Sequence, residues 1–201
     1  PTMGGILVLL AVAIAALAYG MDGMEYVLPA VLATVALGVI GFLDDFLKLR
    51  RGQGLGAAQK LFMEIIIGTL VAVWAYRSPL LGPTLYLPIS GGEWDIGVWY
   101  IPLAAFAFVS EVNGVSLTDG MDGLVSNVTM VYALFMGAIF VVMTTRANQN
   151  GEMLLSANLY GMTVFCAALA GALLAFLRYN AYPAKIALGG TGALAPGVPV
   201  S

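Results

Sequence analysis

The chain has 201 residues, of which 61% are hydrophobic and 9% are charged. A soluble domain uses roughly 45–50% apolar and about 25% charged residues, so this composition excludes an ordinary soluble domain and indicates an integral membrane protein. With a net charge of −3 and no dense basic block, no nucleic acid is expected as a partner.

Six apolar segments follow one another along the chain, and each is near the ~20 residues that a spanning helix needs. Runs of this length exclude barrel strands of ~10 residues, and backbone groups in lipid must be paired within their own segment. The sequence therefore predicts an all-α, polytopic transmembrane helical bundle. The segments are approximately Gly4–Gly20, Tyr26–Leu43, Leu61–Tyr76, Ile96–Val112, Leu124–Met143 and Leu155–Leu177.

Small residues recur at helical spacing in the sixth segment. We expect them to let neighbouring helices pack closely, as small residues do in membrane proteins. They are Ala167, Ala168, Gly171 and Ala172.

Basic residues are distributed unevenly among the predicted loops. The positive-inside rule predicts that the N-terminus and the exits of the even-numbered segments face the cytoplasm. The basic residues of that side are Lys48, Arg50, Arg51, Lys60, Arg178 and Lys185. The opposite side carries Arg77 and Arg146 among the acidic residues Asp22, Glu25, Glu93, Asp95 and Glu152.

Two acidic clusters interrupt this nearly uncharged chain, and both fall on the predicted cytoplasmic side. One is Asp44-Asp45 with Lys48, and the other is the stretch from Asn113 to Leu124, which contains Asp119 and Asp122. Ionisable groups at a membrane edge are expensive and indicate a functional site. A third polar stretch, Arg178-Tyr-Asn-Ala-Tyr-Pro-Ala-Lys185, is expected on the same face.

The spacing of these residues favours phosphate chemistry. Asp44 and Lys48 are four positions apart and would share one face of a helix, whereas the adjacent Asp44 and Asp45 point about 100° apart and cannot easily chelate one ion together. Carboxylates repel an anionic substrate unless a hard cation binds to both. Mg²⁺ that bridges the carboxylates and a substrate diphosphate is the cation that this pattern favours.

Each residue also has a plainly structural interpretation. Asp44 could end the second helix and pair with Lys48, Asp119 could be a helix N-cap, and Asn180 could be a turn residue. Both interpretations stay open on sequence alone.

Four motifs, in order and spacing, resemble the phospho-N-acetylmuramoyl-pentapeptide transferase family of bacterial cell-wall synthesis. They are Pro1-Thr-Met-Gly-Gly5, Gly-Phe-Leu-Asp-Asp-Phe-Leu-Lys48, the Asn113 to Leu124 stretch and Asn180-Ala-Tyr-Pro-Ala-Lys185. Because family members have ten helices and a histidine-rich cytoplasmic motif, the resemblance implies that residues 1–201 form one transmembrane domain that is an internal portion of a larger fold.

The resemblance implies transfer of phospho-N-acetylmuramoyl-pentapeptide from a UDP carrier to undecaprenyl phosphate, with release of UMP and a requirement for Mg²⁺. The implied setting is the bacterial inner membrane, with the active face cytoplasmic. The partners would be the two substrates, the lipid bilayer and, as an open alternative, a second copy of the chain. The implied catalytic residues are Asp44, Asp45, Lys48 and Lys60, and the implied substrate-binding residues are Thr2, Asn113, Asp119, Met121, Asp122 and Asn180.

The chain departs from the family pattern after Lys185. Gly190 stands where the family has an aspartate that binds Mg²⁺, Ala187 replaces a phenylalanine that stacks on uracil, and Ala193 replaces a serine. Earlier in the chain, Ser116 and Glu64 replace Asn and Gln. Two alternatives therefore stay open, namely a related transferase of sugar 1-phosphates to polyprenyl phosphate and a non-catalytic membrane protein built on the same fold.

Overall fold

The structure is a computed structural model that describes residues 4–86, 92–118, 123–181 and 194. In this part of the chain it contains a small two-stranded hairpin and six α-helices, which confirms the predicted all-α bundle. The helices are α1 (Gly5–Tyr19), α2 (Met24–Arg51), α3 (Ala57–Arg77), α4 (Tyr100–Thr118), α5 (Leu124–Gln149) and α6 (Met153–Asn180).

Five of the six helices in the described ranges are long and apolar enough to cross a membrane, and α1, with 15 residues, is shorter. Several helices continue beyond the apolar segments that predicted them. The second runs on to Arg51, where Gly52 ends it with a φ of 70°, and the fourth continues through Asn113 to Thr118. A helix keeps its backbone hydrogen bonds where the sequence becomes polar, so it can continue past the end of its apolar segment. The polar residues that follow the apolar segment are then helical as well.

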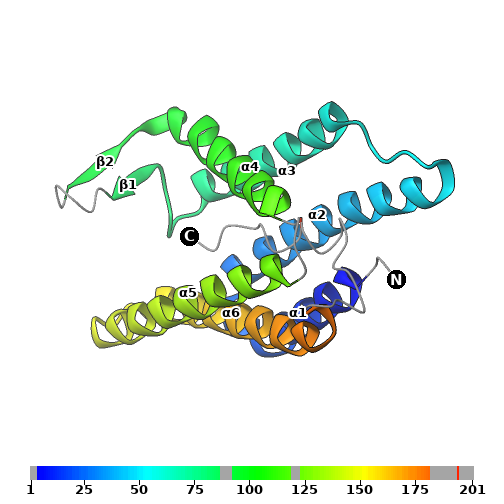
Figure 1. Ribbon diagram of the computed structural model, residues 1–201. Helices are drawn as coiled ribbons and strands as arrows, with labels where there is room; N and C mark the ends of the chain where they lie inside the picture. Colours follow the sequence, from blue (N-terminus) through cyan, green and yellow to red (C-terminus); the bar gives the residue numbers. More distant parts are fainter. Residues whose placement is uncertain (1–3, 87–91, 119–122, 182–193, 195–201) are drawn as a thin grey trace.

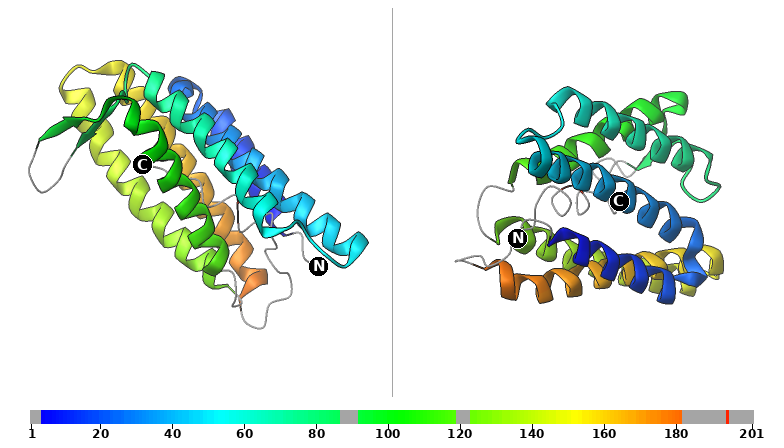
Figure 2. Two further views of the ribbon diagram at one scale, coloured as in Figure 1. Left: turned by 90° about the horizontal axis from the view of Figure 1, so that it is seen from above. Right: turned by 90° about the vertical axis from the view of Figure 1, so that its right-hand side faces the viewer.

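The helices form two layers with α2 between them. Figures 1 and 2 show α3 and α4 side by side on one side of α2, and α1, α5 and α6 on the other. The buried apolar side chains accordingly form two clusters. The larger joins α1, α2, α5 and α6, and the smaller joins α2 and α4 through Leu37, Ile40, Phe108 and Val112. Buried Leu194 also packs in the smaller cluster.

Close helix contacts involve a different glycine from the one expected. A Cβ on Gly161 of α6 would lie 2.6 Å from Val27 of α2, so these helices touch because this glycine has no side chain. The expectation is wrong for Gly171: it is exposed, and a Cβ there would meet no atom of the described structure within 4 Å. The buried face of α6 carries Cys166, Leu169 and Leu173 instead.

The connection between α3 and α4 contains strands β1 (Thr84–Tyr86) and β2 (Glu93–Asp95), which pair antiparallel with Leu85 opposite Trp94. This hairpin projects from one end of the bundle (Figure 1). The 3-10 turns Met21–Gly23 and Gly97–Trp99 precede α2 and α4. Because successive helices alternate in direction, residues 52–56, the start of α5 and the end of α6 lie at the opposite end, which we call the polar end.

Candidate functional site

The last turns of α2 carry two buried carboxylates at the polar end. Asp44 is 5% exposed and Asp45 is 7% exposed. Lys48 donates to Asp44 Oδ2 over 2.7 Å, which confirms that the two residues share a helix face. The side chain of Lys48 is 55% exposed, so its ammonium group can reach a ligand outside the bundle.

Asp44 also fixes the loop that follows α2. The backbone N–H of Leu55 donates to Asp44 Oδ1 over 2.8 Å, so each oxygen of this carboxylate accepts a hydrogen bond. The loop can approach because residue 54 is glycine. A Cβ on Gly54 would overlap Asp44 Oδ1 and would lie 2.7 Å from Lys48 Cε. Asp44 therefore pairs with Lys48 within α2, as its structural interpretation predicted, but it does not end the helix, which runs on to Arg51. Its contact with the loop was not predicted from the sequence.

A second set of polar residues lies where α3 meets α4. Lys60 Nζ donates to Ser116 Oγ over 3.3 Å. One turn further along α3, the Asn113 amide nitrogen donates to Glu64 Oε2 over 2.6 Å. We call these four residues the polar ladder. Lys60 also lies close enough to Asp44 to interact with it electrostatically, which connects the ladder to the end of α2.

The packing of α3 on α4 brings the ladder together. Glycine occurs at position 68, one turn beyond Glu64 on the same face of α3, and its missing side chain lets Phe108 and Val109 approach. A Cβ on Gly68 would lie 3.1 Å from Phe108 Cδ1 and 3.4 Å from Val109 Cγ2. This close approach places Glu64, which is 0% exposed, within hydrogen-bonding distance of Asn113.

Asn180 is the last residue of α6 and is 6% exposed. Its Oδ1 accepts a hydrogen bond from Ser126 of α5 over 3.1 Å, which ties the end of α6 to the start of α5. Gly123, with a φ of 73°, lies before α5, and a Cβ on it would be 3.3 Å from the Asn180 carbonyl oxygen. The sequence offered no direct sign of the roles of Ser126 and Gly123.

The structure thus gathers Asp44, Asp45, Lys48, Lys60, Asn113 and Asn180 at the polar end. The predicted residues Thr2, Asp119, Met121 and Asp122 lie outside the described residues, as do Ala187, Gly190 and Ala193. Within the described ranges, no three acidic, histidine or cysteine side chains form a metal-binding group.

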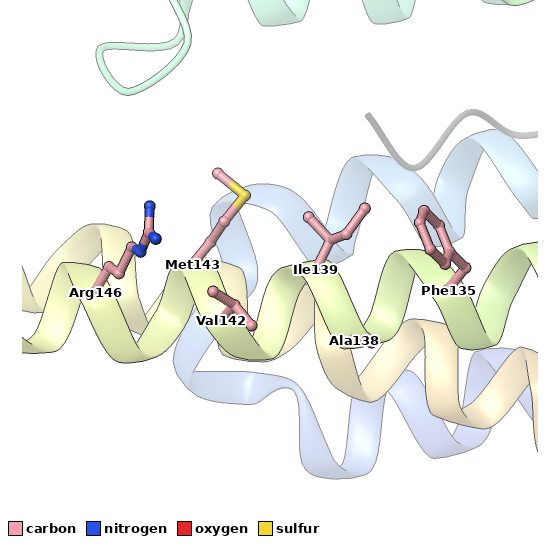
Figure 3. Close-up of a pocket in the computed structure, with 6 residues that line it drawn as sticks. All are labelled: Phe135, Ala138, Ile139, Val142, Met143 and Arg146. Carbon is pink, nitrogen blue, oxygen red and sulfur yellow. The ribbon is translucent and has the colours of Figure 1, made fainter.

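A hollow on α5 lies away from these residues. Phe135, Ile139 and Met143 project from the same side of the helix, with Arg146 beyond them (Figure 3). Phe135 is 67% exposed and Met143 is 45% exposed. An apolar surface of this kind on a membrane-spanning helix suits contact with lipid chains, and it offers no group for phosphate chemistry apart from the one arginine.

Comparison with known proteins gives a matching family model and several relatives that share one name. Residues 27–201 match the model of the family described as Glycosyl transferase family 4. The chain is 36% identical over 199 residues to the phospho-N-acetylmuramoyl-pentapeptide-transferase of Clostridium novyi, covering 98% of this chain and 57% of that protein. It is 38% identical to the protein of the same name from Clostridium kluyveri, covering 98% and 58%. The corresponding protein of Clostridium perfringens is 37% identical over 201 residues, covering 98% and 57%. The chain therefore spans somewhat more than half the length of these relatives.

Proposed function

The chain belongs to glycosyl transferase family 4, and from that membership we propose that the protein transfers phospho-N-acetylmuramoyl-pentapeptide from a UDP carrier to undecaprenyl phosphate, releasing UMP. The observation that carries the proposal is similarity along 98% of the chain to transferases of this name. The gathering of Asp44, Lys48, Lys60 and Asn113 at one end of the bundle supports it, because both substrates contain phosphate.

In the proposed reaction, an oxygen of the lipid phosphate attacks the sugar-bearing phosphorus of the UDP-linked substrate. A new phosphorus–oxygen bond forms, the bond to the second phosphate breaks, and UMP leaves with the electron pair. A phosphate monoester has a second pKa near 6, so the nucleophile is mostly ionised at neutral pH and needs positioning and charge neutralisation more than a base. Direct attack is therefore favoured over a covalent aspartyl intermediate.

The proposal gives separate roles to the residues at the end of α2 and in the ladder. Lys48 and Lys60 neutralise phosphate charge, and Asp44 orients the lipid phosphate and accepts any remaining proton. Both oxygens of Asp44 already accept hydrogen bonds, so this carboxylate would have to exchange the one from the exposed Lys48 when the lipid phosphate binds. Asp119, Met121 and Asn180 would hold the uridine end, while Thr2, Asn113 and Asp122 would line the cleft.

Mg²⁺ is part of the proposal as the ion that neutralises the diphosphate. The donors available at the polar end are carboxylate oxygens, which suit a hard cation, and the chain contains no histidine. In the resembling family the Mg²⁺ ligand lies at the position of Gly190, which is outside the described residues. The proposed location is the bacterial inner membrane with the polar end cytoplasmic, where soluble nucleotide substrates are available.

The experiment measures UMP release by the full-length protein in lipid nanodiscs supplied with undecaprenyl phosphate and the UDP-linked muramoyl-pentapeptide. We expect release that depends on Mg²⁺ and is abolished by EDTA. Lys60→Gln should lose activity, whereas Arg146→Gln, a matched loss of charge at the opposite end of the bundle, should retain it. Release with UDP-N-acetylglucosamine in place of the muramoyl substrate would favour the related sugar-phosphate transferase. Nucleotide binding without any release would favour the non-catalytic alternative.

A further inference from the structure

Glu64 is a carboxyl group with no exposed surface in the interface between α3 and α4. Its Oε2 accepts the 2.6 Å hydrogen bond from Asn113, while Oε1 has no hydrogen-bond partner among the described residues. A buried oxygen without a partner lowers folding stability, because it has lost its hydrogen bonds to water. Stability alone therefore does not account for a glutamate at this position.

The hydrogen bonds around Asn113 fix the orientation of its amide. One hydrogen of the amide nitrogen goes to Glu64 Oε2, and the other goes to the Val109 carbonyl oxygen over 2.9 Å. The Val109 carbonyl oxygen can only accept, so only the nitrogen of the amide can face it. The remaining hydrogen-bonding atom of the side chain is Oδ1, which can only accept.

Asn113 is half-buried, and it lies one turn from the Lys60–Ser116 pair in the ladder. The two neighbouring turns of the ladder therefore suit different groups of a ligand. Lys60 offers positive charge and N–H donors that suit phosphate oxygens. Asn113 offers an acceptor, which would repel a phosphate oxygen and suits a hydroxyl or N–H group.

We propose that Glu64 is a positioning residue that holds Asn113 as a hydrogen-bond acceptor for a hydroxyl or N–H donor of the nucleotide-linked sugar substrate. The inference rests on the proposed function, because that function supplies a ligand with phosphates and donor groups side by side. Lys60 then binds the phosphate part of the ligand, and Asn113 distinguishes the donor-bearing part. Glu64 acts only through Asn113 and does not touch the ligand.

Four variants of the full-length protein in nanodiscs test this chain of contacts. Glu64→Gln keeps an oxygen that can accept from Asn113, whereas Glu64→Met has similar length and only a weakly accepting sulfur. Asn113→Leu removes the residue through which Glu64 acts, and Glu64→Met combined with Asn113→Leu closes a double-mutant cycle. The readouts are the affinity for the UDP-linked substrate, the KM for undecaprenyl phosphate and the thermal unfolding midpoint.

We expect Glu64→Met and Asn113→Leu each to weaken binding of the UDP-linked substrate by roughly tenfold, the usual consequence of losing one such hydrogen bond. The double variant should bind no more weakly than Asn113→Leu alone, and Glu64→Gln should stay within about twofold of the wild type. The KM for undecaprenyl phosphate should not change in any of them. A merely structural role would lower the unfolding midpoint without separating the two substrates.

Three results would overturn the inference: unchanged nucleotide affinity in Glu64→Met, losses that multiply in the double variant, or a loss in Glu64→Gln equal to that in Glu64→Met. Failure of the proposed function is distinguishable from these. A wild-type protein that does not bind the UDP-linked substrate contradicts that function and the ligand assignment together. The coupling of Glu64 to Asn113 would then still be decided by whether their effects on the unfolding midpoint are additive.

Discussion

The backbone N–H of Leu55 donates to Asp44 Oδ1 over 2.8 Å, which holds the loop after α2 against the carboxylate that we propose to orient the lipid phosphate. One side chain thus serves the fold and, in the proposal, the reaction. The other oxygen of Asp44 accepts from Lys48. The two oxygens can be tested separately, because an amide retains one acceptor and an alanine retains none.

Asp44→Asn should lower turnover by about a hundredfold or more while the unfolding midpoint changes little. Asparagine still accepts from Leu55, but its amide nitrogen meets the Lys48 ammonium group and cannot take a proton. Asp44→Ala should in addition lower the free energy of unfolding by about 1–3 kcal/mol, because it leaves the Leu55 N–H without its acceptor. UMP release and thermal unfolding separate the two effects.

Nucleotide affinity tests the proposed division of roles between Asp44 and Asp119. The affinity for a uridine nucleotide should survive Asp44→Asn and fall in Asp119→Asn. Equal losses of affinity in the two variants would contradict these roles.

Gly54→Ala should distort the loop after α2. The added methyl group would overlap Asp44 Oδ1 and Lys48, so we expect a loss of about 1–3 kcal/mol in the free energy of unfolding and reduced UMP release. Gly56→Ala is the matched control in the same loop. Its φ of −63° suits alanine and the nearest atom to its new Cβ is 3.6 Å away, so no overlap arises. Gly56 is the N-cap of α3, where alanine is less favourable than glycine, so we expect a loss of up to ~1 kcal/mol with UMP release retained. Equal damage from both variants would show that contact with Asp44 is not what requires glycine at position 54.

The parts of the site that the sequence predicted are those governed by helical periodicity. The positions of Asp44 and Lys48 predicted a shared face, and the 2.7 Å contact confirms it. Hydropathy also located the helices. It did not locate the end of α4, because a helix that leaves the apolar zone keeps its backbone hydrogen bonds, and Asn113 is therefore helical.

The contacts between elements could not be predicted in the same way. Glu64 differed from the resembling family, but its partner Asn113 lies 49 positions away on another helix, and only the packing of α3 on α4 brings them together. The strands of the hairpin have three residues each, too short for an alternating pattern to reveal. The spacing of Gly171 predicts close helix packing, yet which face of α6 is buried depends on where α1, α2 and α5 lie.

Gly161→Ala should destabilise the bundle, and Gly171→Ala should not. Both glycines lie inside α6, but a Cβ on Gly161 would be 2.6 Å from Val27, whereas one on Gly171 would meet nothing within 4 Å. We expect a loss of about 1–3 kcal/mol for the first and a gain of up to ~1 kcal/mol for the second, because alanine is the better helix former. Thermal unfolding in nanodiscs measures both. Similar destabilisation by the two variants would mean that the exposed face of α6 is covered in the assembled protein.

Labelling of single cysteines tests which side of the membrane the polar end faces. Gln53→Cys lies in the loop after α2 and Gln149→Cys lies at the end of α5, at opposite ends of the bundle. The native Cys166 is buried and should not react with an impermeant thiol reagent. On intact cells we expect labelling of the second variant only, since the basic residues after α2 should stay in the cytoplasm. Labelling of Gln53→Cys from outside would reverse the orientation.

The remaining prediction concerns Ala187 and Gly190 in the altered motif after Lys185, both of which lie outside the described residues. If its residues correspond to the resembling family, Gly190 leaves out a carboxylate that binds Mg²⁺, and Ala187 leaves uracil without an aromatic face worth roughly 1–3 kcal/mol on the scale of base stacking. Weak transferase activity is therefore expected from the full-length protein, and Gly190→Asp together with Ala187→Phe should increase Mg²⁺-dependent UMP release. Ala187→Phe alone should tighten nucleotide binding without changing the dependence on Mg²⁺, which separates the two contributions. If the unaltered protein already releases UMP as fast as the double variant, Gly190 is not at the metal and the correspondence in this segment is wrong.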